Sequence, residues 1–526
     1  MLRHSLFIFA SLTLFAADVA QEGVRWWSHI EVLADDKMEG RNTGSEGHKK
    51  AAQYVAGEFE RNGLKPAGTS GYIQPVKFNV RKLDEPASSV AMVRNGKVTP
   101  LKLGDDASLS LRADLAPTVD APAVFAGYAL VVPEKGFDDL AGLDLKGKIA
   151  VFLSGGPSSI PSALKAHYSS AAERWKALQK AGAIGIATIA NPRSMDIPWE
   201  RARLARLSPT MNVADEKLFE TRGQQFALTV NPAQAEKLFA GSGHTFAEIL
   251  KLADSDQPLP RFPLNFNFRA RVKIDHSQVE SQNVAAIRPG SDPSLKDEYV
   301  VFSAHLDHLG VGEPINGDRI YNGAMDDASG VASLIEIAMM MKERNLHLKR
   351  SVLFVAVTGE EKGLQGSLYF ANYPTVPKKS MVADINMDMF LPLFPLKYLE
   401  VQGLSESTLG DDIRAICQKN GVTVQADKEP DRNLFIRSDQ YNFIRQGIPA
   451  LAFKFGYLPG SPEEKTAKDW LKNRYHAPSD DLAQPVDKTA AAQFNRILLE
   501  LGEKVANAKD RPHWNADSFF KRFQTE

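Results

Sequence analysis

Short, continuously apolar runs in the second half of the chain limit its fold more than any other feature. They are residues 299–303, 351–358, 382–387 and 449–454. Runs of this kind are expected of strands that are covered on both faces. Segments with helical spacing lie between or after them, at residues 328–343, 407–420 and 488–507. This alternation predicts an α/β fold in which helices sandwich a mostly parallel central sheet.

The 526 residues are too many for one ordinary domain. Residues 115–265 combine buried-strand patterns and a helix at about 170–181, but they contain no cluster of histidines and carboxylates. We expect an inserted β/α domain there. The main domain is then expected to comprise residues 21–114 and 266–508, followed by a polar tail at residues 509–526.

The N-terminus has the pattern of a secretory signal peptide. Arg3 and His4 precede an apolar run at residues 6–15, and small residues and the polar pair Gln21–Glu22 follow. A membrane-spanning helix needs ~20 apolar residues, so this run is too short to span a bilayer. We expect a signal peptide at residues 1–20, export to the periplasm or the exterior, and no membrane association after cleavage. An uncleaved anchor is the alternative.

Composition excludes several classes of protein. The formal net charge is −1, which gives no reason to expect nucleic acid or an anionic membrane as a partner. Cys417 is the only cysteine, so an internal disulfide and cysteine-based zinc sites are excluded. Any metal must be held by His, Asp and Glu side chains.

Five such side chains follow predicted strands or turns in five separate segments. They are His305, Asp326, Glu361, Asp388 and His476. Imidazole and carboxylate groups suit zinc, and a carboxylate can bridge two ions. Three carboxylates in one cleft repel one another, whereas two divalent cations would leave the cluster at about +1. Any one segment is more often a surface pair or a solvated helix start, but five in order at strand ends predict a site for two metal ions.

The same segments resemble a known family. Their order is similar to that of the motifs in the two-zinc, co-catalytic aminopeptidases and glutamate carboxypeptidase-like metallopeptidases. It runs His-x-Asp, Gly-Ala-x-Asp-Asp-Ala-Ser-Gly, Glu-Glu, Asp and a late Tyr-His. Residues 39–47 resemble the N-terminal signature of that family, and the insert resembles its protease-associated domain. The resemblance implies a zinc exopeptidase fold with two Zn²⁺ ions per chain. One zinc would be held by His305 and Asp388 and the other by Glu361 and His476, with Asp326 between them.

The resemblance also assigns catalytic roles. Glu360 matches the general base, Asp307 matches the carboxylate that orients the His305 ring, and Asp327 matches a residue that shapes the turn after the bridging ligand. Some members carry an oxyanion-stabilising tyrosine where this chain has Phe435. Tyr441 is the candidate substitute, with packing in the core as the alternative role.

The implied function is that of an exported aminopeptidase. A metal-bridging hydroxide would attack the first peptide bond of substrates with a free N-terminus, and Glu360 would act as the base. Alternatives are a carboxypeptidase or dipeptidase, or a glutaminyl cyclase on the same fold. A receptor-like binding protein without catalysis is a further alternative, which the complete ligand set disfavours.

Overall fold

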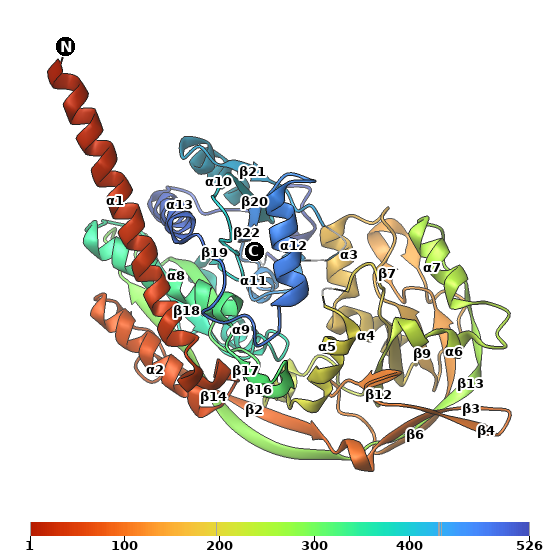
Figure 1. Cartoon of the computed structure of the whole chain (residues 1–526). Helices are drawn as coiled ribbons and strands as arrows, with labels where there is room; N and C mark the ends of the chain where they lie inside the picture. Colours follow the sequence, from red (N-terminus) through yellow and green to blue (C-terminus); the bar gives the residue numbers. More distant parts are fainter. Residues whose placement is uncertain (1, 196, 430–431, 433, 525–526) are drawn as a thin grey trace. The chain divides into compact units, whose positions relative to one another are not determined.

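The computed structural model describes residues 2–195, 197–429, 432 and 434–524, with side chains described from residue 18 onward. The chain divides into two compact units (Figure 1). Unit 1 comprises Met1–Lys77, Glu280–Lys428 and Arg437–Glu526, and unit 2 comprises Phe78–Val279 and Glu429–Ile436.

Unit 1 contains the central sheet. Its strands, in chain order, are β1 (Lys65–Pro66), β2 (Ile73–Leu83), β14 (Ile274–Arg288), β15 (Tyr299–His305), β16 (Gly310–Ile315), β17 (Asp318–Tyr321), β18 (Ser351–Val357), β19 (Met381–Asn386), β20 (Tyr398–Gln402), β21 (Thr423–Gln425) and β22 (Ala450–Gly456). The chain passes into unit 2 within β2 and returns within β14. From β2 onward the sheet order is β2-β14-β18-β15-β19-β22-β20-β21, with β1 also paired to β14, while β16 and β17 form a separate hairpin. The four strands from β18 to β22 are mutually parallel, and β14 and β20 run antiparallel to their neighbours β18 and β22.

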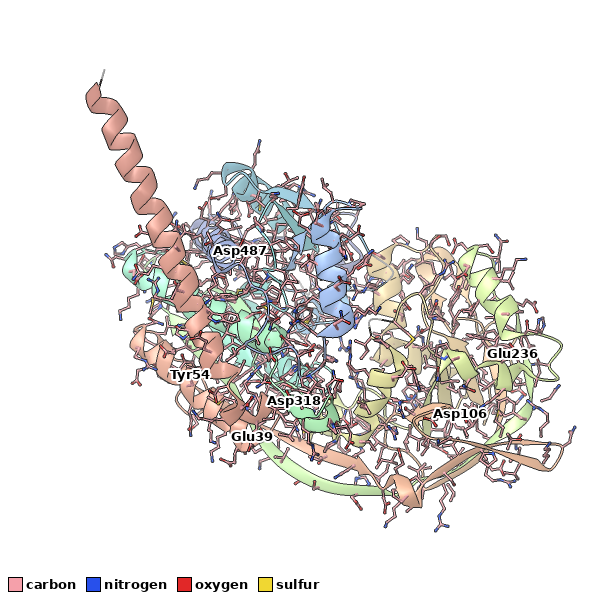
Figure 2. The ribbon with its side chains drawn as sticks, viewed as in Figure 1. Glu39, Tyr54, Asp106, Glu236, Asp318 and Asp487 are labelled. Carbon is pink, nitrogen blue, oxygen red and sulfur yellow. The ribbon has the colours of Figure 1, made fainter. Side chains whose placement is uncertain are left out.

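Helices cover both faces of this sheet. They are α1 (Leu2–Leu33), α2 (Glu46–Arg61), α8 (Ser329–Glu343), α9 (Gln365–Asn372), α10 (Leu409–Lys419), α11 (Gln440–Ile444), α12 (Pro462–Asn473) and α13 (Lys488–Asn507), the last capped by the Asp487 side chain (Figures 1 and 2). Successive strand residues enter different cores: Phe302 of β15 packs in the larger apolar cluster, and Val301 packs in a second one. This alternation is what a strand buried on both faces requires. The predicted α/β fold with a largely parallel central sheet is confirmed.

Unit 2 is a second β/α body. Its strands are β3 (Ser89–Arg94), β4 (Lys97–Leu101), β5 (Ala107–Leu109), β6 (Thr118–Ala126), β7 (Val131–Val132), β8 (Phe137–Asp138), β9 (Ile149–Leu153), β10 (Gly185–Ile189), β11 (Thr210–Val213), β12 (Phe226–Val230) and β13 (Arg261–Arg271). Its helices are α3 (Ser162–Ser169), α4 (Ala171–Lys180), α5 (Trp199–Ala202), α6 (Glu236–Phe239) and α7 (Phe246–Asp254). Eight of the strands form one sheet in the order β4-β3-β13-β6-β9-β10-β12-β5.

Unit 2 extends beyond the insert expected at residues 115–265. It begins at Phe78 because β3 pairs with β13 and β5 pairs with β12, so the short strands before residue 115 complete its sheet. The sequence lacks a signal for these pairings, since they join segments far apart in the chain.

The two ends of the chain also differ in detail from the expectation. Residues of the expected signal segment lie in α1, and among the described residues no helix has an apolar stretch suited to crossing a bilayer. In the expected polar tail, Trp514 and Phe520 are buried, and the Trp514 indole donates a hydrogen bond to the Gly447 carbonyl. Residues 525–526 of that tail lie outside the described part.

Candidate metal centre

The five expected ligands occupy the ends of adjacent strands and the loops beside them. His305 is the last residue of β15, Asp388 follows β19 by two residues, and Glu361 follows β18 by four. Because β18, β15 and β19 are parallel neighbours, their carboxyl ends meet at one edge of the sheet. Asp326 lies in a short turn, η7 (Ala324–Ala328), before α8, and His476 follows α12.

The first group of ligands surrounds the His305 ring. Its Nε2 atom lies 3.1 Å from Oδ1 of Asp326 and 3.5 Å from Oδ1 of Asp388. Its Nδ1 atom lies 3.0 Å from the Asp307 carbonyl oxygen, which can only accept, so Nδ1 carries the proton and Nε2 offers its lone pair. Burial lowers the pKa of His305, but Asp326 and Asp388 outweigh that effect and hold the pKa well above its ordinary value.

The second group surrounds the His476 ring. Its Nε2 atom is 3.3 Å from Oδ2 of Asp326 and 3.3 Å from Oε2 of Glu361. Asp326 therefore presents one carboxylate oxygen to each histidine. Burial and Glu361 raise the pKa of Asp326, but the surrounding histidines reverse this, and the net pKa lies below the ordinary value.

The donor atoms fit zinc on two independent grounds. Ligand atoms on a tetrahedral zinc with bonds of 2.0–2.2 Å stand about 3.3–3.6 Å apart, and the His–carboxylate separations above lie close to that range. Several of the converging atoms are buried without any hydrogen-bond partner among the described residues, namely His305 Nε2, Asp326 Oδ2, Glu361 Oε1 and Asp388 Oδ1. Buried polar atoms are normally satisfied, so this cluster has the character of a cation site. The donor groups His305–Asp327–Asp388 and His308–Asp326–Glu361 each bring one atom per residue within 4.8 Å of the others.

Glu360 stands at the edge of this cluster. Its backbone N–H donates to Oδ1 of Asp307 at 3.1 Å, which fixes the turn after β18. Desolvation, together with the carboxylates of Glu361 and Asp388, raises the pKa of Glu360 well above its ordinary value, against the opposing effect of His305. A carboxyl group with a raised pKa suits proton transfer near neutral pH.

The role expected for the Asp307 carboxylate differs from the observed contacts. Its Oδ1 atom is 4.0 Å from His305 Nδ1, whereas the Asp307 carbonyl oxygen is only 3.0 Å from that nitrogen. The carboxylate instead accepts from the Glu360 backbone and from the Thr43 hydroxyl at 2.9 Å. Asp307 thus contacts the His305 ring through its main chain and Glu360 through its side chain.

Asp327 joins several segments of the centre. Its carboxylate accepts backbone N–H groups of His305 at 3.3 Å, Gly330 at 3.0 Å and Met389 at 3.3 Å. These donors belong to β15, to the start of α8 and to the segment after β19. The Asp326–Asp327 peptide bond is cis. The turn-shaping contact expected of Asp327 is the one to Gly330.

Arg41, within the expected N-terminal signature, is completely buried beneath the ligand loops. Its guanidinium donates to four carbonyl oxygens, those of Leu33, Leu306, Asn322 and Gly323, at 2.6–2.9 Å. Two of these carbonyls directly precede the η7 turn that carries Asp326. Burial lowers the pKa of Arg41 to about 10, so the group remains charged at neutral pH.

The two tyrosines near the site differ in their surroundings. Tyr441 lies in α11 with 5% exposure, and the Arg445 guanidinium lies over its ring, 5.7 Å from the centroid. Tyr475 lies against His476, with ring centroids 4.0 Å apart and the ring planes tilted by 39°. Burial and then the Asp326 carboxylate raise the pKa of Tyr475 well above its ordinary value. The oxyanion role of Tyr441 stays a prediction.

Sequence reasoning missed two polar residues of the centre. His308 is completely buried, with Nδ1 2.8 Å from Oε1 of Glu361. Asp480 accepts the backbone N–H groups of Met325 at 2.9 Å and Asp326 at 3.1 Å. Both lie within four residues of an expected ligand, so proximity in the sequence was the available signal, but spacing alone did not indicate where their side chains point.

Comparison with known proteins was consistent with this geometry. The profile of Peptidase family M28 matches residues 283–502. In overall fold the chain is similar to the solved aminopeptidase from Aneurinibacillus sp. strain AM-1, with 19% identity, a TM-score of 0.58, and coverage of 96% of this chain and 99% of that chain.

Two curated relatives match shorter stretches. A probable zinc metalloprotease of Pyrenophora tritici-repentis is 34% identical over 106 residues, which are 20% of this chain and 23% of that protein. Carboxypeptidase Q of Xenopus laevis is 30% identical over 122 residues, 23% of this chain and 24% of that protein. The chain thus matches only about a quarter of the length of these relatives. The region that matches the model of Peptidase family M28, residues 283–502, contains all five expected ligands, and the α/β fold around it is similar to that of the Aneurinibacillus aminopeptidase.

Proposed function

We propose that this protein is an exported two-zinc aminopeptidase that removes N-terminal residues from peptides. The observation that carries the proposal is the position of Asp326. Its Oδ1 lies 3.1 Å from His305 Nε2, and its Oδ2 lies 3.3 Å from His476 Nε2. A carboxylate placed between two histidines in this way suits a bridge between two metal ions.

The residues present would hold one zinc with His305 and Asp388 and the other with Glu361 and His476, with Asp326 shared. Zinc at these positions would supply Lewis acidity, which lowers the pKa of water and polarises a scissile carbonyl. The shared ligand supports two ions rather than one, because its two oxygens face two different histidines, Oδ1 toward His305 and Oδ2 toward His476.

Glu360 supplies the proton transfers in this proposal. Its carboxylate takes a proton from the attacking water and returns it to the leaving amine nitrogen. The Asp307 carboxylate, through the Glu360 backbone N–H, holds this residue at the cluster. Tyr441 remains the proposed oxyanion donor, and the substrate is a peptide with a free N-terminus.

The aminopeptidase assignment has support from the whole-chain likeness to the Aneurinibacillus aminopeptidase. A second candidate, a carboxypeptidase or dipeptidase, has support from the similarity to carboxypeptidase Q. Export follows from the signal-like sequence at residues 1–20, and the accessory role of residues 115–265 is part of the same proposal.

The test measures the metal content of the purified protein and its hydrolysis of aminoacyl amides with free or N-acetylated amines. Two zincs per chain, with cleavage of the free-amine substrates alone, are expected. Cleavage of N-blocked dipeptides with a free carboxylate would select the carboxypeptidase instead. A protein that binds no zinc and cleaves neither substrate would overturn both candidates.

A further inference from the structure

We propose that His308 is a positioning residue of the second metal position, where its Nδ1–H holds Oε1 of Glu361 and leaves Oε2 to face the metal. This inference rests on the proposed function, because it assumes a metal between Asp326, Glu361 and His476. It assigns a role to a fourth side chain at that position.

Distances separate the role of His308 from that of His476. Nδ1 of His308 lies 2.8 Å from Oε1 of Glu361 and 3.8 Å from Oδ2 of Asp326. A hydrogen bond from nitrogen to a carboxylate is about 2.7–2.9 Å long, whereas two ligands of one tetrahedral zinc stand about 3.3–3.6 Å apart. His476 Nε2, at 3.3 Å from both carboxylates, matches the ligand spacing. His308 matches the hydrogen-bond spacing.

Hydrogen-bond accounting leads to the same pairing. Within the described parts of the chain, both ring nitrogens of His308 and Oε1 of Glu361 are buried and have no hydrogen-bond partner of good geometry. The two groups are within hydrogen-bond distance but imperfectly aligned, as hydrogen bonds at catalytic sites often are before ligands are bound. Because a buried polar atom without a partner is costly, the imidazole and the carboxylate are each other's natural partners.

The surroundings hold the His308 ring in place. The residue is completely buried, and its backbone N–H donates to the Arg41 carbonyl at 3.3 Å. Gly323 lies against the ring, where an added Cβ would come within 2.5 Å of His308 Cγ. Its φ of 62° is also one that glycine adopts without strain. The ring is therefore packed closely against the backbone of Gly323.

This contact has a consequence for the coordination of the metal. A carboxylate with one oxygen engaged binds through the other oxygen alone, so it occupies one coordination position instead of two. A catalytic zinc site needs a position left open for water or substrate. His308 would thus keep the second metal position open by restricting Glu361.

The experiment compares three substitutions of His308 with a control. Asn places an amide N–H near the position of Nδ1, Gln places it near Nε2, and Leu removes it. His29→Leu is the matched control, because His29 is also buried in unit 1 and its ring bonds Tyr54, at 2.7 Å, and not a proposed ligand (Figure 2 labels Tyr54). Zinc affinity is measured by competition with a chelator, and the visible spectrum of the Co²⁺-substituted protein reports coordination number.

His308→Leu and His308→Gln should weaken one of two zinc-binding steps by about 10–100-fold, as loss of a partner to a metal ligand commonly does. Their Co²⁺ spectra should shift toward higher coordination number as Glu361 becomes bidentate. His308→Asn should restore most of the affinity and the spectrum, and His29→Leu should change neither.

Unchanged zinc affinity and an unchanged Co²⁺ spectrum in His308→Gln would overturn the inference. Loss of a whole zinc equivalent in His308→Asn as well would also overturn it, since His308 would then be a ligand itself. An unsubstituted protein without zinc would instead overturn the proposed function, and the inference with it.

Discussion

The Asp307 carboxylate accepts the backbone N–H of Glu360 at 3.1 Å, so the side chain that follows β15 sets the position of the residue that follows β18. The same residue contacts the His305 ring through its carbonyl oxygen. One residue thus links His305, a proposed metal ligand, to the proposed base, and its two contacts can be separated by substitution.

Replacing Glu360 with Gln should abolish turnover without loss of metal. Gln is nearly isosteric but cannot accept and return a proton, so kcat should fall by about 10²–10⁴-fold. Steady-state kinetics and zinc analysis of the same sample give the result. Glu46→Gln, an exposed change on α2, is the control and should leave both unchanged. Retained activity would remove Glu360 as the base.

Asp307→Ala should lower kcat more than it lowers zinc affinity. The backbone carbonyl that orients His305 survives this change, whereas the acceptor for the Glu360 N–H is lost. Thr43→Val removes only the hydroxyl that donates to the other carboxylate oxygen and should have a smaller effect. Parallel zinc titrations and kinetics test this, and an equal loss in both quantities would mean that the carboxylate acts through the His305 ring.

Arg41→Met should destabilise the fold and weaken metal binding together. The change leaves four carbonyl oxygens without their donor, and hydrogen bonds to charged groups contribute about 1.5–3 kcal/mol each, so a loss above about 3 kcal/mol is expected. Urea unfolding and zinc titration measure the two effects. Arg61→Met, at a side chain that is 65% exposed, is the control. An equally stable Arg41→Met protein would show that these bonds do not hold the ligand loops.

Removing zinc should lower the stability of unit 1. A ligand that binds only the folded state stabilises it by RT ln(1 + [L]/Kd), about 4 kcal/mol at a thousandfold excess over Kd. The unpartnered carboxylate oxygens of Asp326, Glu361 and Asp388 would then repel one another. Calorimetry with added zinc and with a chelator should therefore give separate melting temperatures. Identical melting curves would argue against metal at this cluster.

His29 should make the protein less stable in mild acid. Burial, reinforced by Arg61 and Arg25, lowers its pKa from 6.5 to about 4, so between these values the unfolded chain binds a proton that the folded chain does not. The contribution of neutral His29 to the free energy of unfolding is complete above pH 6.5 and is lost as the pH falls toward 4. At 1.36 kcal/mol for each pH unit below 6.5, the free energy of unfolding falls by up to about 2 kcal/mol by pH 5.

The measurement is the free energy of unfolding in urea at pH 7.5 and pH 5. His29→Asn can still bond the Tyr54 hydroxyl but does not titrate, so its stability should depend less on pH than that of the unsubstituted protein. Equal pH dependence in the two proteins would mean that the pKa of His29 is the same in the folded and the unfolded state.

The sequence by itself determined the α/β fold and the set of five candidate ligands. Apolar runs of five to eight residues can be read locally, and polar residues directly after such runs must gather wherever parallel strands end. His305, Glu361 and Asp388 were found in this way. The same local patterns indicated α4, α8 and α13 within a few residues of their bounds.

Only the tertiary structure decided which atoms meet. The division of the Asp326 oxygens between His305 and His476 depends on side-chain directions set by packing. The contact of His308 with Glu361, and the use of a carbonyl rather than a carboxylate by Asp307, depend on the same packing. Strand pairing between distant segments likewise moved the start of unit 2 to Phe78. The sequence shows which residue types recur and with what spacing. Contacts between segments far apart in the chain form only when the long-range register of the sheet is fixed.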